Sequence, residues 1–217
     1  MDLQKRYCPI QIHLTPTEAY SLVVDIVING EKRRIIPSAA MFGSMFDGFL
    51  SAVYLLYTEG KDCHNSGKLQ TVTRDIDNDI ISSKLEWDDG GTIITIRFSR
   101  EYHSKCFETK DADPVKMSIT YEVDDNLFET SQYTVEGRDL CYAVAKACTE
   151  MLMTYGIRGY TYSTGDDTVA DDMFDLDHLL FVKAYALNVP EVRKMERKEN
   201  GLASDIDKEI ELLMFDM

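Results

Sequence analysis

The sequence predicts an α+β fold in which an antiparallel β-sheet of about six to eight strands packs against two or three helices, with a further helix at the C-terminus. Two observations lead to this class. Extended segments that alternate apolar and polar residues follow one another through short turns, the pattern of an antiparallel sheet with one buried face. Segments with apolar residues every three or four positions precede and follow them, as in helices that cover a sheet.

The N-terminal region predicts a β-hairpin. Residues 19–28 are apolar and largely β-branched, and residues 31–36 form a second extended segment after Asn29 and Gly30. An Asn-Gly pair between two extended segments favours a tight hairpin turn, because both residues tolerate positive φ. Residues 8–14 predict a short strand before the hairpin.

Residues 40–58 predict a helix that ends at Gly60, since apolar residues recur along one stripe. The stripe consists of Phe42, Met45, Phe46, Phe49, Val53, Leu56 and Tyr57. A polar loop follows, and the middle of the chain then predicts two further hairpins with strands at residues 79–87, 92–100, 117–123 and 128–135. Aspartate, asparagine and glycine residues at 88–91 and 124–126 supply their turns.

A long helix is predicted from Arg138 to Tyr155. Its core face is formed by Leu140, Val144, Cys148, Met151, Leu152 and Tyr155. Gly156 suits the C-terminal cap of this helix, because glycine adopts the left-handed conformation that such caps require. Residues 157–163 then predict one more strand.

The last third of the chain predicts two more helices. One spans residues 176–187, with Asp175 as its N-terminal cap, and Asn188-Val189-Pro190 ends it. We expect residues 1–190 to form a single α+β domain and residues 191–217 a charged helical appendage. Ser204 is the predicted cap of the final helix. Its apolar stripe, Ile206, Ile210 and Leu213, is expected to dock on the main body or on a neighbouring chain.

Negative charge is concentrated in the middle of the chain. The formal net charge is -15, and residues 62–180 carry twenty-four acidic and eleven basic side chains, whereas residues 1–61 carry six of each. No lysine or arginine stands between Arg158 and Lys183. Such a charge distribution repels nucleic acid and anionic membranes and attracts a basic protein.

Aromatic rings beside carboxylates predict a protein-binding surface, because aromatic anchors surrounded by charge are typical of binding hot spots. The predicted partner-binding residues are Asp166, Asp167, Asp171, Asp172, Tyr160 and Tyr162. The alternative for the two tyrosines is that their rings fill the core. Trp87, next to Asp88 and Asp89, is expected in the core.

Several sequence patterns contain part of a metal-binding or catalytic motif, but none contains all of it. Asp75, Asp77, Asp79 and Glu86 have the spacing of several calcium ligands, but Ile80 stands where a helix–loop–helix site needs glycine. Gly165-Asp166-Asp167 is typical of a turn, and His178 is expected on the surface beside Asp175 and Asp177. We therefore predict no catalytic group, no metal and no cofactor.

The cysteines and the N-terminus indicate a cytoplasmic protein. Five cysteines at irregular spacing predict reduced, mostly buried thiols instead of disulfides or a zinc site. The polar N-terminus lacks the apolar stretch of a signal peptide, and no apolar run is long enough to span a bilayer.

The order of elements resembles the small acidic immunity proteins of bacterial polymorphic toxin and contact-dependent inhibition systems. The resemblance spans roughly residues 19–187 and depends on pattern and charge. The segments that carry it are Phe46–Val53, Leu85–Trp87, Asp89–Gly91, Tyr155–Gly156 and Phe174–Leu180. It implies a cytoplasmic, non-enzymatic single-domain protein that neutralises a cognate toxin by covering it.

The sequence thus predicts an acidic binding protein that occludes a basic partner, such as a nuclease toxin, and binds neither nucleic acid nor membrane. Three alternatives stay open at this point. They are a metal-dependent hydrolase that uses the aspartates, an inhibitor that mimics DNA, and a subunit of a larger assembly that docks through the final helix. The oligomeric state is not specified by the sequence.

Overall fold

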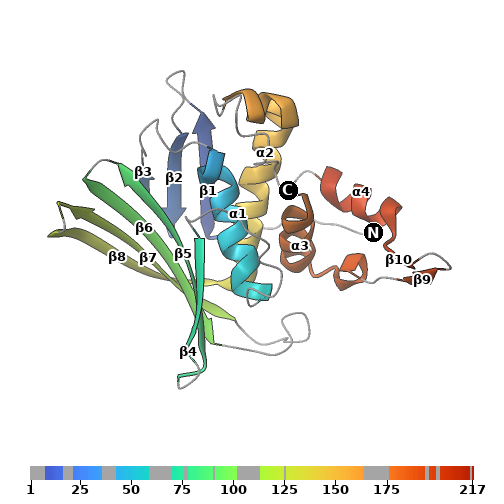
Figure 1. Ribbon diagram of the computed structural model, residues 1–217, viewed down its shortest axis with the longest axis horizontal. Helices are drawn as coiled ribbons and strands as arrows, with labels where there is room; N and C mark the ends of the chain where they lie inside the picture. Colours follow the sequence, from blue (N-terminus) through green and yellow to red (C-terminus); the bar gives the residue numbers. More distant parts are fainter. Residues whose placement is uncertain are drawn as a thin grey trace.

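In the computed structural model, two main antiparallel sheets pack with three helices, and a fourth helix lies at the C-terminal end of the chain (Figure 1). The structure describes residues 8–16, 22–35, 43–58, 70–75, 78–89, 91–101, 113–124, 126–163, 176–193, 196–198, 201–215 and 217. The predicted α+β class is confirmed. The main strands are divided between a three-stranded and a five-stranded sheet.

The three-stranded sheet contains the predicted N-terminal hairpin. Its strands are β1 (Ile10–Pro16), β2 (Leu22–Ile28) and β3 (Glu31–Ile35), in the order β1-β2-β3. Asn29 and Gly30 form the turn with φ values of 51° and 86°, as a tight hairpin turn requires. One face of this sheet is buried and consists of Ile10, Ile12, Val24, Ile26, Ile28 and Ile35.

The five-stranded sheet is a meander in the order β4-β5-β6-β7-β8. Its strands are β4 (Gln70–Asp75), β5 (Ile80–Asp89), β6 (Thr92–Glu101), β7 (Pro114–Val123) and β8 (Asn126–Glu136). Both predicted hairpins, β5–β6 and β7–β8, are confirmed. Strand β4 was not predicted, because this polar edge strand has only one apolar residue, Val72, and lacks an alternating pattern.

One face of the five-stranded sheet lies on the core. In β6, Ile94, Ile96 and Phe98 are buried, whereas Arg97 between them is exposed. Trp87 of β5 is buried on the same side of the sheet, as expected, and its ring packs 5.9 Å from that of Phe49. The alternation of apolar and polar residues therefore predicts correctly which face of the sheet packs against the helices.

Helix α1 (Gly43–Thr58) lies in the middle of the core. It contacts β4, β5 and β6 on one side and α2 and α3 on the other, and every side chain from Phe49 to Tyr57 is buried. The prediction of a single apolar stripe therefore underestimates how much of α1 is buried. A helix that is buried on all sides needs apolar residues around its whole circumference. Thr58 ends the helix, and Gly60 lies outside the described residues.

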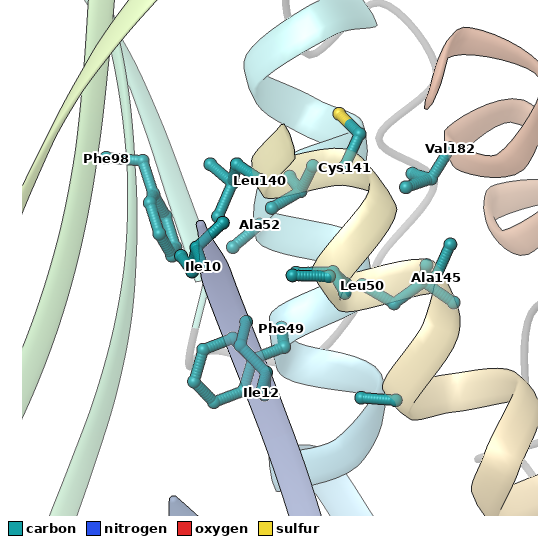
Figure 2. Packing of buried hydrophobic residues seen from close by; sticks show 14 of the residues in the cluster. Ile10, Ile12, Phe49, Leu50, Ala52, Phe98, Leu140, Cys141, Ala145 and Val182 are labelled. Atoms are coloured by element: carbon teal, nitrogen blue, oxygen red, sulfur yellow. The ribbon is translucent and has the colours of Figure 1, made fainter. Parts of the chain in front are cut away.

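Both sheets contribute side chains to the core around α1. Figure 2 shows Phe98 of β6 close to Ile10 of β1 and Leu140 of α2, with Phe49 of α1 beside Ile12. All five side chains are buried in one apolar cluster. The two sheets and the three helices are therefore held together by a common core, as expected for a chain of this length.

Helix α2 (Gly137–Ser163) is longer than predicted. It continues through Gly156 and through residues 157–163, so the predicted cap and the predicted strand are both wrong. A glycine inside a helix costs only about 1 kcal/mol, and each added helical residue gains a backbone hydrogen bond. The β-propensity of Tyr160 and Tyr162 depends on a sheet to pair with, so it does not decide the backbone here.

Helix α3 (Leu176–Leu187) has the predicted bounds. Its end is also as predicted, because Asn188 takes a left-handed conformation with φ of 57°. Val189 N–H then donates to the carbonyl oxygen of Ala184 at 2.8 Å, which satisfies a helix-terminal acceptor. The predicted cap residue Asp175 lies outside the described residues.

The C-terminal region consists of a 3₁₀ turn (Pro190–Arg193), two paired strands, β9 (Glu196–Lys198) and β10 (Gly201–Ala203), and helix α4 (Ile206–Met214). The short β9–β10 hairpin was not predicted, since strands of this length carry no readable alternation. Helix α4 contacts α3 and lies beyond it from the five-stranded sheet (Figure 1).

One prediction about α4 is wrong. Asp205, not Ser204, caps the helix, because the Asp205 carboxylate accepts from Lys208 N–H and also favours the positive helix end. Of the predicted apolar stripe, Leu213 packs against the body, whereas Ile206 and Ile210 are exposed. Leu212, which is not part of that stripe, is fully buried against the body.

Candidate functional site

The structure leaves the predicted partner-binding residues untested. Asp166, Asp167, Asp171 and Asp172 lie outside the described residues. Tyr160 and Tyr162 lie on the C-terminal part of α2, where the structure describes the backbone and not the side chains. Their role in binding therefore stays a prediction, and the described residues contain other charged surfaces.

One such surface is the end of the five-stranded sheet at which two turns meet. The β5–β6 turn includes Gly91 with φ of 115°, and the β7–β8 turn includes Asp124 with φ of 48°. The N–H of Asp124 donates to the carbonyl oxygen of Gly91 at 2.8 Å, and Thr92 pairs with Val123 across β6 and β7. Two turns more than 30 residues apart in the sequence therefore lie side by side.

We name this surface the acidic turn edge and define it, within the described chain, as residues 86–89, 91–92, 122–124 and 126–127. These segments contain Glu86, Asp88, Asp89, Glu122 and Asp124 and no lysine or arginine, and Lys84 of β5 pairs with Glu86 at 2.7 Å. Asp124 is exposed and Glu122 half-buried, while Asp88 and Asp89 are the last two residues of β5. Glu122 and Asp124 therefore present negative charge at this end of the sheet.

Apolar side chains accompany these carboxylates. Leu127 is 66 % exposed and Val123 is 39 % exposed, both at the β7–β8 turn. The pairing of β7 and β8 shifts between Tyr121 and Glu122, the irregularity of a β-bulge. Bulges bend a strand and redirect its side chains, and they are common next to functional surfaces. Leu127 and Val123 therefore offer exposed apolar area beside the carboxylates of this surface.

A second polar feature lies inside the molecule, and we name it the buried polar centre. Arg100 and Asp113 are both buried, with 3.5 Å between Nη1 and Oδ1. The Tyr185 hydroxyl donates to Asp113 Oδ2 at 3.0 Å. Arg100 Nε donates to the carbonyl oxygen of Leu56 at 3.3 Å, and its guanidinium lies 4.5 Å from the Tyr57 ring centroid. The buried charges are therefore compensated by ionic, hydrogen-bond and ring contacts.

The buried polar centre also fixes the start of α2. Gly137 N–H donates to the carbonyl oxygen of Asp113 at 2.8 Å, and a Cβ at position 137 would overlap the Tyr57 hydroxyl. Burial raises the pKa of Tyr57 well above its ordinary value, and burial is also the main cause of a raised pKa for Tyr185. Both phenols stay protonated near neutral pH, and the Tyr185 hydroxyl donates to Asp113. These contacts join α1, β6, α2 and α3 and indicate a structural role.

A hydroxyl and an imidazole meet between α1 and α3. Ser51 Oγ lies 3.2 Å from His178 Nδ1, and the His178 ring stacks on Tyr54 with centroids 3.8 Å apart. The histidine is half-buried against α1 and not a plain surface residue as expected. A nucleophile and its base need such a distance, but they also need access to a substrate. Ser51 is fully buried, so this pair holds two helices together in the present conformation.

The calcium-like spacing does not produce a metal site in the described residues. Asp75 accepts from both the N–H and the side-chain amide of Asn78, and Glu86 is paired with Lys84. Asp77 and the sequence Gly165-Asp166-Asp167 lie outside the described residues. Within the part that is described, no three histidine, cysteine or acidic side chains are placed to hold one ion.

The described thiols agree with the sequence. Cys8, Cys141 and Cys148 are buried and free of disulfides, and Cys63 and Cys106 lie outside the described residues. Among the helices that the structure describes, none combines the length and the apolar character that crossing a membrane requires.

In comparisons with known proteins, no family model, no curated protein and no solved structure matches this chain.

Proposed function

We propose that this chain is a non-enzymatic acidic binding protein of the cytoplasm that neutralises a basic partner protein, such as a nuclease toxin, by covering it. The observation that carries the proposal is the acidic turn edge, where two turns distant in the sequence lie side by side and Asp124 is exposed within segments that carry several acidic side chains and no lysine or arginine. The net charge of -15 supports it.

The physical argument concerns both rate and affinity. Carboxylates on one surface attract a basic protein over about 10 Å at physiological ionic strength and speed its encounter with that surface. Charge complementarity then selects the partner and the register, while affinity comes mainly from buried side chains. Leu127 and Val123 are exposed at the same edge and offer apolar contact area.

Occlusion suits a partner that acts on nucleic acid. Such a protein carries lysine and arginine side chains in its substrate channel, because they neutralise phosphates. A rigid sheet end that carries carboxylates fits the mouth of that channel and excludes the nucleic acid. The resemblance to immunity proteins points to the same class of partner.

The first experiment captures partners on the immobilised chain. A bacterial cell extract is passed over it at about 20 mM and about 500 mM salt, and the retained proteins are identified. We expect basic proteins to be retained at low salt and released at high salt. Retention of no basic protein at low salt would overturn the proposal, and retention of several unrelated DNA-binding proteins, each displaced by duplex DNA, would favour the DNA-mimic alternative.

A matched pair of variants tests the edge itself. Glu122→Gln with Asp124→Asn removes two negative charges from the acidic turn edge, and Asp79→Asn with Glu101→Gln removes two at the other end of the sheet. Asp124 and Asp79 are both exposed, with φ of 48° and 52°, which asparagine tolerates. We expect the first variant alone to lose retention. Equal losses in both would show that net charge, not this edge, binds the partner.

A third variant tests the predicted partner-binding segment. It combines Asp166→Asn, Asp167→Asn, Asp171→Asn and Asp172→Asn and removes four negative charges. If this variant alone fails to retain the basic partner, the partner binds residues 166–172 and not the acidic turn edge.

A further inference from the structure

Helix α4 carries a row of apolar side chains that face the solvent. Ile206, Ile210 and Met214 are 61 %, 52 % and 62 % exposed. Residues four positions apart lie on one side of a helix, so the three side chains form a continuous apolar row. We name this row the outward face of α4.

The opposite side of α4 is held by the body. Leu212 is fully buried, and Lys183 Nζ of α3 donates to the carbonyl oxygens of Leu213 and Phe215, at 2.8 Å each. These contacts fix the rotation of the helix about its axis. The outward face is therefore a fixed property of the fold, and the helix cannot bury it without giving up Leu212 and Lys183.

Acidic side chains border the outward face. Asp207 and Glu211 are exposed and lie on the same helix, and the cap residue Asp205 forms an ion pair with Lys208 at 3.0 Å. Residues 205–214 carry four carboxylates against one lysine. An apolar row with a negative border differs from an ordinary solvated helix face, on which the exposed positions are polar.

We infer that the outward face of α4 docks an amphipathic helical segment of a partner protein that carries lysine or arginine beside its own apolar side chains. Apolar rows on the two helices exclude water from each other, and the basic side chains of the partner meet Asp207 and Glu211. The complementary charge selects this occupant over a second copy of the chain, because two copies would bring carboxylates together.

This surface is separate from the acidic turn edge. Helix α4 contacts α3, and α1 lies between α3 and the five-stranded sheet (Figure 1). The inference therefore goes beyond the proposed function, and each surface can fail independently of the other.

The test uses the full chain and a synthetic peptide. The probe is a labelled peptide of about 18 residues with leucine at every third or fourth position and lysine at the remaining ones, long enough to form a helix on binding. A scrambled peptide of the same composition is the control for charge alone. Binding is followed by fluorescence anisotropy at low and physiological ionic strength, and we expect the patterned peptide to bind more tightly.

Two variants locate the binding site. Ile206→Ser with Ile210→Ser removes two members of the outward face, and we expect the Kd for the patterned peptide to rise about tenfold or more. Met153→Ser is the matched control, because Met153 of α2 is an equally exposed apolar side chain on a helix, and it should leave Kd unchanged. Circular dichroism shows whether both variants keep the fold.

Four outcomes would overturn the inference. Equal affinity for the patterned and scrambled peptides would show that charge alone is recognised, which leaves the proposed function intact. If Ile206→Ser with Ile210→Ser leaves the Kd for the patterned peptide unchanged, α4 is not the binding site. The same conclusion follows if the wild-type chain does not bind the peptide at low salt. Concentration-dependent dimers in sedimentation experiments that disappear in this variant would make a second copy the occupant.

Discussion

Arg100 and Lys183 are both buried, yet they are stabilised in different ways. Arg100 lies beside the carboxylate of Asp113 and above the Tyr57 ring, in the middle of the core. Lys183 donates to two carbonyl oxygens at the end of α4, where the helix dipole is negative. The described contacts of Arg100 therefore include a carboxylate of the core, and those of Lys183 include two carbonyl oxygens of a peripheral helix.

The difference shows what each side chain contributes to the fold. The contacts of Arg100 and its neighbours join α1, β6, α3 and the residue before β7, so they are present only when the whole core is assembled. The contacts of Lys183 with Leu213 and Phe215 join the body to one terminal helix. Loss of the first set should therefore destabilise the molecule as a whole, and loss of the second should release α4.

The largest effect is expected for Asp113→Ala. The substitution leaves Arg100 buried without its carboxylate and removes the acceptor of the Tyr185 hydroxyl. We expect the free energy of unfolding to fall by about 3–5 kcal/mol, since the remaining charge is uncompensated. Urea unfolding followed by circular dichroism measures it. Tyr185→Phe, which removes only the hydroxyl, should cost about 1 kcal/mol, and similar small losses for both variants would show that Asp113 does not neutralise Arg100.

Lys183→Met is expected to have a smaller and local effect. Methionine keeps the apolar stem and loses the hydrogen bonds to the two carbonyl oxygens, at a cost of about 2 kcal/mol. Hydrogen exchange should accelerate in residues 206–214 while the core strands keep their protection. Lys208→Met, at an exposed position of α4, is the control and should change neither measurement. Faster exchange throughout the core would contradict the local role of Lys183.

A third charged group lies at the surface of the three-stranded sheet and extends the comparison to a pH effect. Asp25 accepts from Arg34 Nε and Nη2 at 2.8 and 2.9 Å and pairs with Lys32 at 3.0 Å. The hydrogen bond from Arg34 is the main cause of an Asp25 pKa well below its ordinary value. The folded state therefore favours the ionised form, and the resulting stability is present above the unfolded pKa of about 3.9.

Asp25→Asn should therefore cost about 1 kcal/mol at pH 7, where both cationic partners are largely exposed to solvent. The difference between wild type and variant should shrink as the pH falls below about 4, because Asp25 of the unfolded chain takes up a proton there while the folded state still favours the ionised form. Thermal unfolding between pH 7 and pH 2.5 checks both points. A difference that stays constant across this range would show that the ion pairs do not stabilise the fold.

Local sequence signals predicted much of the fold. Asn29-Gly30 specified a turn, alternating residues specified the inner face of β6, and Asn188 marked the end of α3, because each depends on neighbours in the sequence. The end of α2 and the rotation of α4 depend on distant contacts. Gly156 is tolerated within a continuous helix, and the position of α4 is determined by Lys183 from another helix.

The candidate site was less predictable for a related reason. The aspartates of the two turns are visible in the sequence, but their adjacency depends on the pairing of β6 with β7. The burial of Arg100 could not be expected either, since its partner Asp113 and its ring contact Tyr57 come from separate parts of the chain. The alternation of β6 was the available signal, because Arg100 continues the inward series of Ile94, Ile96 and Phe98.

The smallest effect on stability is expected for the outward face of α4. Ile206→Ser with Ile210→Ser should change the free energy of unfolding by about 0.5 kcal/mol or less, because both side chains are largely exposed in the folded chain. Leu212→Ser on the same helix should cost about 3 kcal/mol, since Leu212 is fully buried. Urea unfolding of the two variants measures the contrast. A large loss for the isoleucine pair would mean that these side chains pack against the chain itself, and α4 would then have no apolar face left for a partner.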